Sequence, residues 1–259
     1  MLKRIQSWEG HLLSKAGREV LLKTVAQALP TYAMSVFLLP VKTVSHLESL
    51  MSKYWWGSSN NKTKGVSWFS WRLCRSKNSG GIGFRNLRDY NLSLLGKQGW
   101  RLLLYEDSLV GRIYKARYFP NGNFLSAEIG LNPSFIWWSV FESQRLVRDG
   151  ARRRIGSGVS TPVLNVPWLV SDENPCVISR HPGLAHSTVS QLMHIDRKQW
   201  DLEVLHDLFE ARDIELIMQV PLSDNVNVDS WFWGKESNGF YSVKSSYRYL
   251  QELKGEWGV

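Results

Sequence analysis

The segment spanning residues 53–77, KYWWGSSNNKTKGVSWFSWRLCRSK, interleaves cationic and aromatic side chains at short intervals. Its cations are Lys53, Lys62, Lys64, Arg72, Arg75 and Lys77, and its tryptophans are Trp55, Trp56, Trp68 and Trp71. Lysine and arginine neutralise phosphates, and indole rings stack on nucleobases or pack into a groove. The segment is therefore a candidate nucleic-acid contact. In the alternative interpretation the tryptophans anchor a core at helix ends, and the lysines only keep a loop soluble.

A second basic group is the run Arg152, Arg153 and Arg154, close to Gly150. Three successive guanidinium groups are suited to binding phosphate oxygens. We predict that this run also contacts nucleic acid. The alternative interpretation is that it only marks the edge of a domain.

Common catalytic motifs are missing from the chain. Two-metal phosphoryl transfer needs carboxylates that converge on cations, yet the first 155 residues contain only Asp89, Asp107 and Asp149, with no Asp-Asp pair. The sequence GSGVS at 156–160 lacks the closing glycine of a nucleophile elbow, and GGIGF at 80–84 lacks the spacing of a dinucleotide fingerprint. We therefore predict no catalytic residues, no cofactor and no small-molecule ligand.

The densest group of metal-ligating residue types is Cys176, His181, His186 and His194. A closed zinc site needs four ligands at short paired intervals, and no second ligand follows Cys176 within two to four residues. The pattern favours a loop with incidental histidines, and no metal site is predicted.

Charge is divided unevenly along the chain. Residues 1–155 carry 24 Lys and Arg against 9 Asp and Glu, whereas residues 156–259 carry 8 against 14. A basic region with interspersed aromatic residues is typical of a polyanion-binding protein, and nucleic acid is the commonest polyanion. The two cysteines lie far apart in the sequence, which fits a reducing intracellular compartment, cytoplasmic or nuclear. The most apolar stretch, 32–41, is too short to span a membrane.

Hydrophobic spacing and cap residues predict a mainly α fold with minor β. An N-terminal helical bundle is expected, with helices over 14–29, 31–39, 44–56, 87–105, 108–118 and 134–147. A smaller α+β segment follows, with short strands and turns over 155–169 and helix over 199–218, broken near Arg212. The C-terminal part predicts a hairpin around 235–239 and a helix from Val243.

Several motifs in a fixed order resemble a known family. They are IQSWEGHLLSKAGREVLLKTVAQALPTYAMSVFLLP, MSKYWWGSSNNK, WRLCRSKNSGGIGFRNLRDYNLSLLGKQGWRLL, ARYFP, a GxG turn followed by PWL, and WFWGKESNGFYSVKSSYRYL. Together they resemble the region downstream of the polymerase core in reverse transcriptases of plant non-LTR retrotransposons. The resemblance covers most of residues 1–169 and resumes near the C-terminus.

The resemblance implies three parts. Residues 1–155 would correspond to the polymerase thumb and connection, 156–229 to a variable linker region, and 230–259 to the truncated start of a zinc-binding reverse-transcriptase domain. In that family the catalytic aspartates lie upstream of this region, and the zinc ligands and a ribonuclease H domain lie downstream. Residues 151–168 depart from the pattern, because the tryptophan and acidic residue expected around the GxG turn are absent.

Three functional hypotheses follow. The first is a non-catalytic fragment that binds the backbone of duplex or RNA weakly and in a salt-dependent way, with no membrane partner. The second is an inactive translated relic with no biochemical activity. The third is a protein-interaction module that recruits an acidic partner or binds the acidic half of its own chain.

Overall fold

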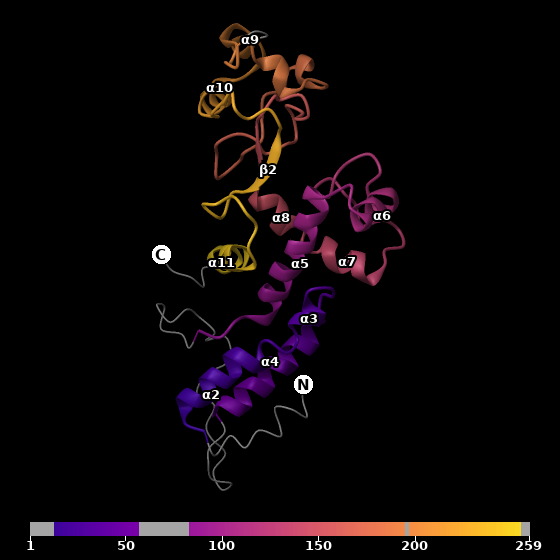
Figure 1. The fold of residues 1–259 in the computed structure, drawn as a ribbon, viewed down its shortest axis with the longest axis vertical. Helices are drawn as coiled ribbons and strands as arrows, with labels where there is room; N and C mark the ends of the chain where they lie inside the picture. The colour runs from indigo at the N-terminus through magenta and orange to yellow at the C-terminus, as the bar shows by residue number, and fades with distance from the viewer. Residues whose placement is uncertain (1–12, 57–82, 195–196, 255–259) are drawn as a thin grey trace. The chain divides into compact units, whose positions relative to one another are not determined.

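The computed structural model describes residues 13–56, 83–194 and 197–254. Helices dominate these residues, and the sheet among them has two strands, so the predicted class is confirmed as mainly α with minor β (Figure 1). The chain forms two compact units: unit 1 comprises Met1–Asp149 with Tyr241–Val259, and unit 2 comprises Gly150–Phe240. The predicted division after residues 155 and 229 is based on the family resemblance, whereas these units are defined by contacts within the structure. The predicted division therefore stays a prediction. No helix in the described ranges is long and apolar enough to cross a membrane.

Unit 1 is a helical assembly. Its elements are α2 (Lys15–Leu21), the π-helical turn η2 (Leu22–Ala26), α3 (Thr31–Met34), α4 (Val41–Trp56), α5 (Leu87–Leu104), α6 (Leu109–Tyr118), α7 (Phe135–Phe141), α8 (Gln144–Gly150) and α11 (Val243–Leu253). Four of these helices begin at the cap residues Ser14, Asn86, Ser108 and Ser134. Each cap side chain accepts a hydrogen bond from a backbone N–H three residues later, which satisfies a donor that the helix itself leaves unpaired.

The helix predicted over 31–39 is shorter in the structure, because α3 ends at Met34. The buried side chain of Asn91 on α5 takes over the backbone groups that follow. Its Nδ2 donates to the carbonyl oxygens of Met34 and Phe37 at 2.7 and 3.0 Å, and its Oδ1 accepts from the N–H of Leu39 at 2.8 Å. The backbone can leave the helix here because the buried Asn91 amide supplies hydrogen bonds to three backbone groups that would otherwise be unpaired.

The C-terminal helix α11 packs against α5, although more than 130 residues separate the two in sequence (Figure 1). Tyr241, just before α11, donates from its hydroxyl to the carbonyl oxygen of Ser93 at 2.9 Å and stacks on Trp100 at a centroid distance of 5.9 Å. At the other end of the contact, the Asp89 carboxylate is buried. It accepts hydrogen bonds from Lys254 Nζ at 2.6 and 2.7 Å and from Gln251 Nε2 at 2.6 Å. A buried carboxylate is stable only when it is paired in this way.

Gly96 is the point of closest approach between α5 and Tyr241. A Cβ atom at Gly96 would lie 2.3 Å from the Tyr241 hydroxyl oxygen and 3.2 Å from its Cζ. We expect Gly96→Ala to destabilise the chain by about 1–3 kcal/mol, because the ring must shift. In a Tyr241→Phe background the oxygen is gone, and the higher helix propensity of alanine, worth about 1 kcal/mol, should offset most of the cost.

Urea unfolding of the wild type, both single variants and the double variant measures this coupling. An equal cost of Gly96→Ala in the two backgrounds would show that the hydroxyl contact does not determine the packing.

Unit 2 pairs its two strands across a long sequence interval. Strand β1 (Ala151–Arg154) runs antiparallel to β2 (Ser230–Trp233), with Ala151 opposite Trp233 and Arg154 opposite Ser230. The predicted hairpin around 235–239 is therefore wrong as a strand pair. Residues 234–239 instead form a tight turn, in which the N–H of Trp233 donates to the carbonyl oxygen of Gly239 at 2.7 Å.

Between the strands, unit 2 contains short helices and loops around one apolar core. The helices are η5 (Pro182–Leu184), η6 (Val189–Leu192), α9 (Leu202–Leu208) and α10 (Ala211–Met218). The last two match the predicted helix over 199–218, and the break falls at Phe209 and Glu210, before Arg212. The core includes Val163, Trp168, Leu192, Leu205 and Ile217.

The carboxylate of Asp229 organises the glycine turn that follows β1. Its Oδ1 accepts from the N–H groups of Gly156 and Gly158 at 2.7 and 2.9 Å. Its Oδ2 accepts from the N–H and hydroxyl of Ser160 at 3.1 and 2.9 Å and from the hydroxyl of Thr161 at 2.8 Å. Burial by itself raises the pKa of Asp229, but these hydrogen bonds outweigh it and lower the pKa below its ordinary value.

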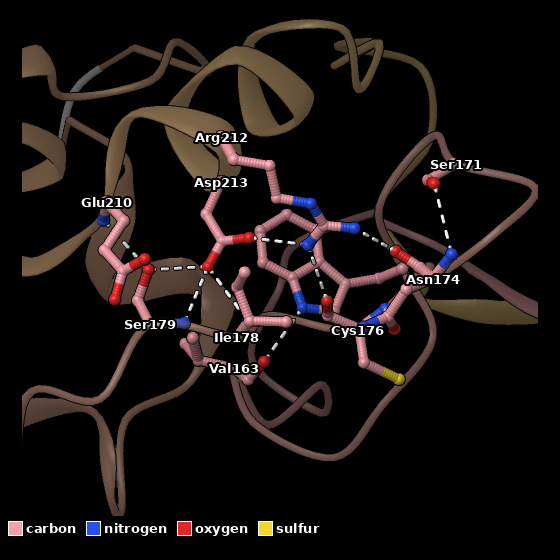
Figure 2. A network of polar contacts seen from close by, with 10 residues as sticks. Val163, Ser171, Asn174, Cys176, Ile178, Ser179, Glu210, Arg212 and Asp213 are labelled. Atoms are coloured by element: carbon pink, nitrogen blue, oxygen red, sulfur yellow. Dashed lines mark hydrogen bonds and ion pairs between the residues drawn. The ribbon is translucent and has the colours of Figure 1, made fainter.

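A second buried carboxylate, Asp213 on α10, fixes the loop around residues 174–179 (Figure 2). Asp213 Oδ2 accepts from the N–H of Ile178 at 2.9 Å and from the N–H and hydroxyl of Ser179 at 2.8 and 2.5 Å. Arg212 donates to Asp213 Oδ1 at 2.8 Å and to the carbonyl oxygens of Asn174 and Cys176. Burial raises the pKa of Asp213, but the bonds from Ser179, Arg212 and Ile178 prevail and lower it.

Replacing Asp229 by asparagine tests its role. The substitution turns one carboxylate oxygen into an NH₂ group. This group cannot accept the hydrogen bonds that the backbone N–H and hydroxyl groups of the turn donate, so these buried donors lose their acceptor. We expect Asp229→Asn to lower the free energy of unfolding by about 2–3 kcal/mol. The exposed Asp224→Asn is the matched control and should change stability by less than about 0.5 kcal/mol in the same urea titration. Equal effects of the two variants would contradict the assignment.

Acid should destabilise unit 2. A carboxyl whose folded pKa is lowered contributes stability that is present above its unfolded pKa, about 3.9, and is lost as pH falls toward the folded pKa. Both Asp213 and Asp229 have lowered pKa values. We therefore expect the urea midpoint to fall progressively below about pH 4, and Asp229→Asn to show a weaker fall. A midpoint that is constant between pH 6 and pH 3 would oppose this.

Candidate nucleic-acid interface

The two structural units keep the division of charge that is seen along the sequence. Unit 1, with its C-terminal return, carries 24 Lys and Arg against 11 Asp and Glu, whereas unit 2 carries 8 against 12. The basic excess therefore belongs to the helical unit. Self-repulsion of this charge is relieved by binding a polyanion.

Exposed cations of unit 1 lie in helical register. Lys97 and Arg101 are exposed and four residues apart on α5, so they share one face of that helix. On α4, Lys42 and Lys53 are exposed at an interval of three helical turns. The ion pairs recorded within unit 1 involve other lysines, as in Lys23 with Glu19 and Lys115 with Glu106.

Lys53, Trp55 and Trp56 form the last turn of α4, where the aromatic-basic segment starts. Lys53 is exposed, and both indoles are half-buried. Trp55 packs against the apolar cluster around Met51 and meets the ring of Phe84 edge-on, at a centroid distance of 5.5 Å. The structure thus gives Trp55 the core contact that the alternative interpretation describes, with Lys53 beside it on the surface.

The other predicted contact residues of this segment lie outside the described residues. They are Lys62, Lys64, Trp68, Arg72, Arg75 and Lys77. Their assignment stays a prediction.

The three predicted arginines form most of β1. Because successive side chains of a strand point to opposite faces, the three do not share one face. Arg153 is held by protein partners: its Nε donates to the hydroxyl of Thr161 at 3.2 Å and its Nη2 to the hydroxyl of Ser160 at 2.9 Å. Arg152 is buried, and its Nη1 donates to the carbonyl oxygen of Ala151 at 2.9 Å. Arg154 is exposed, and its guanidinium lies over the ring of Phe232, 5.7 Å from the centroid.

A groove of about 350 Å³ lies beside these arginines in unit 2. Its polar lining consists of the arginine run together with Ser171 and Asp172, and its apolar lining includes Trp168, Leu169, Val220 and Phe232. Asp172 is opposed by Lys235, whose Nζ lies 3.8 Å from the carboxylate. The sequence singled out the arginines but not the groove, because Val220 and Phe232 reach it from segments 50 or more residues away.

The cysteine and histidines form no cluster. Among the described residues, no group of three or more His, Cys, Asp or Glu side chains is placed to hold a metal ion. His181 Nδ1 accepts from the N–H of Gly183 at 3.1 Å, and His194 lies 3.5 Å from Asp201. Burial raises the pKa of the Cys176 thiol, and the nearby charges of Arg152 and Arg212 only partly oppose the shift. The thiol is therefore a poor nucleophile at neutral pH.

Comparison with known proteins gives two plant relatives. The chain is 40% identical over 150 residues to the uncharacterized mitochondrial protein AtMg00310 of Arabidopsis thaliana; the match covers 57% of this chain and 96% of that protein. It is 28% identical over 268 aligned positions to the putative ribonuclease H protein At1g65750 of the same plant, and this match covers 95% of this chain but 41% of that protein. No family model matches, and no solved structure matches.

The chain belongs to the same family as the Arabidopsis mitochondrial protein, since it covers nearly all of that relative at 40% identity. The two relatives are consistent with a protein derived from a plant retrotransposon. One relative is named as uncharacterized and the other as putative, so neither brings an established activity to this chain.

Proposed function

We propose that this chain is a non-catalytic fragment of a non-LTR retrotransposon reverse transcriptase that retains binding to the nucleic-acid backbone. Unit 1 would correspond to the thumb and connection, and its cations would contact phosphates without reading base sequence. The predicted contacts include Lys53, Trp55 and Trp56, the six residues between Lys62 and Lys77 named above, and the run Arg152–Arg154.

The observation that carries the proposal is the charge of unit 1. Unit 1 has an excess of 13 positive charges, and among its described residues exposed pairs such as Lys97 and Arg101 stand in helical register. An α-helix that presents cations four residues apart offers them about 6 Å from one another, so both can approach the same stretch of a nucleic-acid backbone.

The reverse-transcriptase origin is supported by the ordered motifs and by the putative ribonuclease H protein, of whose length the chain spans 41%. That relative is more than twice as long as the matched region, and its name refers to ribonuclease H. Both facts fit an origin of this chain in a larger polyprotein that contains a ribonuclease H domain. The absence of enzymatic activity is supported by the missing catalytic motifs and by the roles of the buried carboxylates. Asp89, Asp213 and Asp229 are each saturated with protein hydrogen bonds, which leaves them unsuited to holding catalytic metal ions.

Salt dependence tests backbone binding. If about five phosphates are neutralised, the logarithm of affinity for a 20-base-pair duplex should fall with the logarithm of salt concentration at a slope of about −4 to −5, measured by fluorescence anisotropy. The double variant Lys97→Gln/Arg101→Gln should weaken binding and make the slope shallower by about 2.

Two exposed arginines of unit 2 supply the matched control. Arg180→Gln/Arg197→Gln removes the same number of charges from the acidic unit and should leave the slope within about 0.5 of the wild type. The proposal fails if the wild type binds no duplex at low salt. It also fails if binding is insensitive to salt.

A further inference from the structure

Part of the wall of the groove in unit 2 is made by the β1–β2 pair, from which Arg152, Arg153, Arg154 and Phe232 line it. Side chains of directly opposed residues in an antiparallel pair lie on the same face, and neighbours along a strand alternate. Arg152 is opposite Phe232, so Arg152, Arg154 and Phe232 share one face, and all three line the groove. Arg153 belongs to the other face, where its guanidinium lies 5.0 Å from the ring centroid of Trp231.

The two arginines on the groove face, Arg152 and Arg154, differ in exposure. Arg152 is 8% exposed, so it contributes positive charge from beneath the surface rather than a reaching side chain. Arg154 is exposed at the groove. It contacts the ring of Phe232, and no other described residue forms a hydrogen bond or an ion pair with its guanidinium. A guanidinium that is held in place by stacking and keeps its donors available is preorganised for an anion.

The rest of the lining is apolar and aromatic. Phe232 is half-buried, Val170 and Pro221 are exposed at the rim, and Trp168 and Leu169 form the buried wall behind them. The volume of about 350 Å³ falls at the small end of the range for ligand pockets. A flat aromatic body with an attached anion fits this combination, whereas a duplex, whose bases are stacked inside, presents only its phosphates to such a hollow.

We propose that this groove binds one unpaired nucleotide of a single strand, with the phosphate at Arg154 and the base against Phe232. The inference rests on the proposed function only in that the ligand is nucleic acid. It assigns single-strand binding to the groove of unit 2, while the backbone binding of duplex under the proposed function rests mainly on the cations of unit 1.

Anisotropy with a labelled eight-nucleotide oligouridylate and the full chain tests the proposal. Loss of a base-aromatic stack lowers affinity by about 5- to 150-fold, and we expect Phe232→Leu, which keeps an apolar side chain, to weaken binding within that range. Phe232→Tyr should bind within about twofold of the wild type, because the ring is retained. We expect Arg154→Gln to weaken binding by about 5- to 10-fold.

The control is Arg180→Gln, which removes one charge from an exposed position outside the groove lining and should change affinity by less than about twofold. Thermal melting of each variant establishes that it is folded. If folded Phe232→Leu and Arg154→Gln both bind the oligonucleotide as tightly as the wild type, the groove is not the site. Uridine monophosphate that competes at the same concentration as the oligonucleotide would also overturn the assignment, because the ligand would then be a free nucleotide.

The same variants with the 20-base-pair duplex separate the two proposals. Duplex affinity that is unchanged in Phe232→Leu, together with lost oligonucleotide affinity, supports the division between the units. Wild-type duplex binding with no detectable oligonucleotide binding overturns the groove and leaves the proposed function intact. Absence of binding to either probe removes both proposals.

Discussion

The packing of α11 on α5 is the contact that closes unit 1. Helix α5 carries the groups that organise its neighbours: Asn91 supports the backbone after α3, Gly96 admits Tyr241, and Asp89 receives Lys254. These partners come from both ends of the described sequence, so unit 1 is complete only when residues 241–254 have returned to it. A helix whose opposite faces are engaged in this way has little freedom to shift, and the exposed register of Lys97 and Arg101 is fixed along with it.

Buried and exposed charges have separate tasks in this chain. The buried carboxylates are used to fix the structure, since each accepts several hydrogen bonds from backbone or side-chain donors that would otherwise be unsatisfied. Among the described residues of unit 1, most lysines and arginines are exposed, and the ion pairs they make include Lys23 with Glu19 and Lys115 with Glu106. Stability therefore depends on the buried acidic residues, whereas removing an exposed lysine or arginine without a buried partner costs little stability.

Local signals in the sequence predicted the local structure well. The starts predicted for α2, α5, α6, α7 and α11 agree with the structure, whereas the single helix predicted over 134–147 is divided into α7 and α8. Pairings that span long sequence intervals had no local signal. The pattern SWFWGKESNG favours a hairpin with its own turn, but β2 pairs with β1, about 80 residues earlier. Asp229 likewise gives no hint that its partners are the glycines of 156–158. The arginine run was visible in the sequence, whereas the groove depends on that strand pairing and was not.

The pairing of β1 with β2 also brings the two ends of unit 2 together. The N–H of Gly234 donates to the carbonyl oxygen of Gly150 at 2.8 Å, and the N–H of Trp233 donates to that of Gly239 at 2.7 Å, so residues near the two ends of this unit lie close together. A module whose ends lie close together tolerates changes of length between them, because such changes need not move the chain on either side. A longer or shorter segment between β1 and β2 that keeps Gly150 paired with Gly234 would therefore leave the course of the flanking chain unchanged.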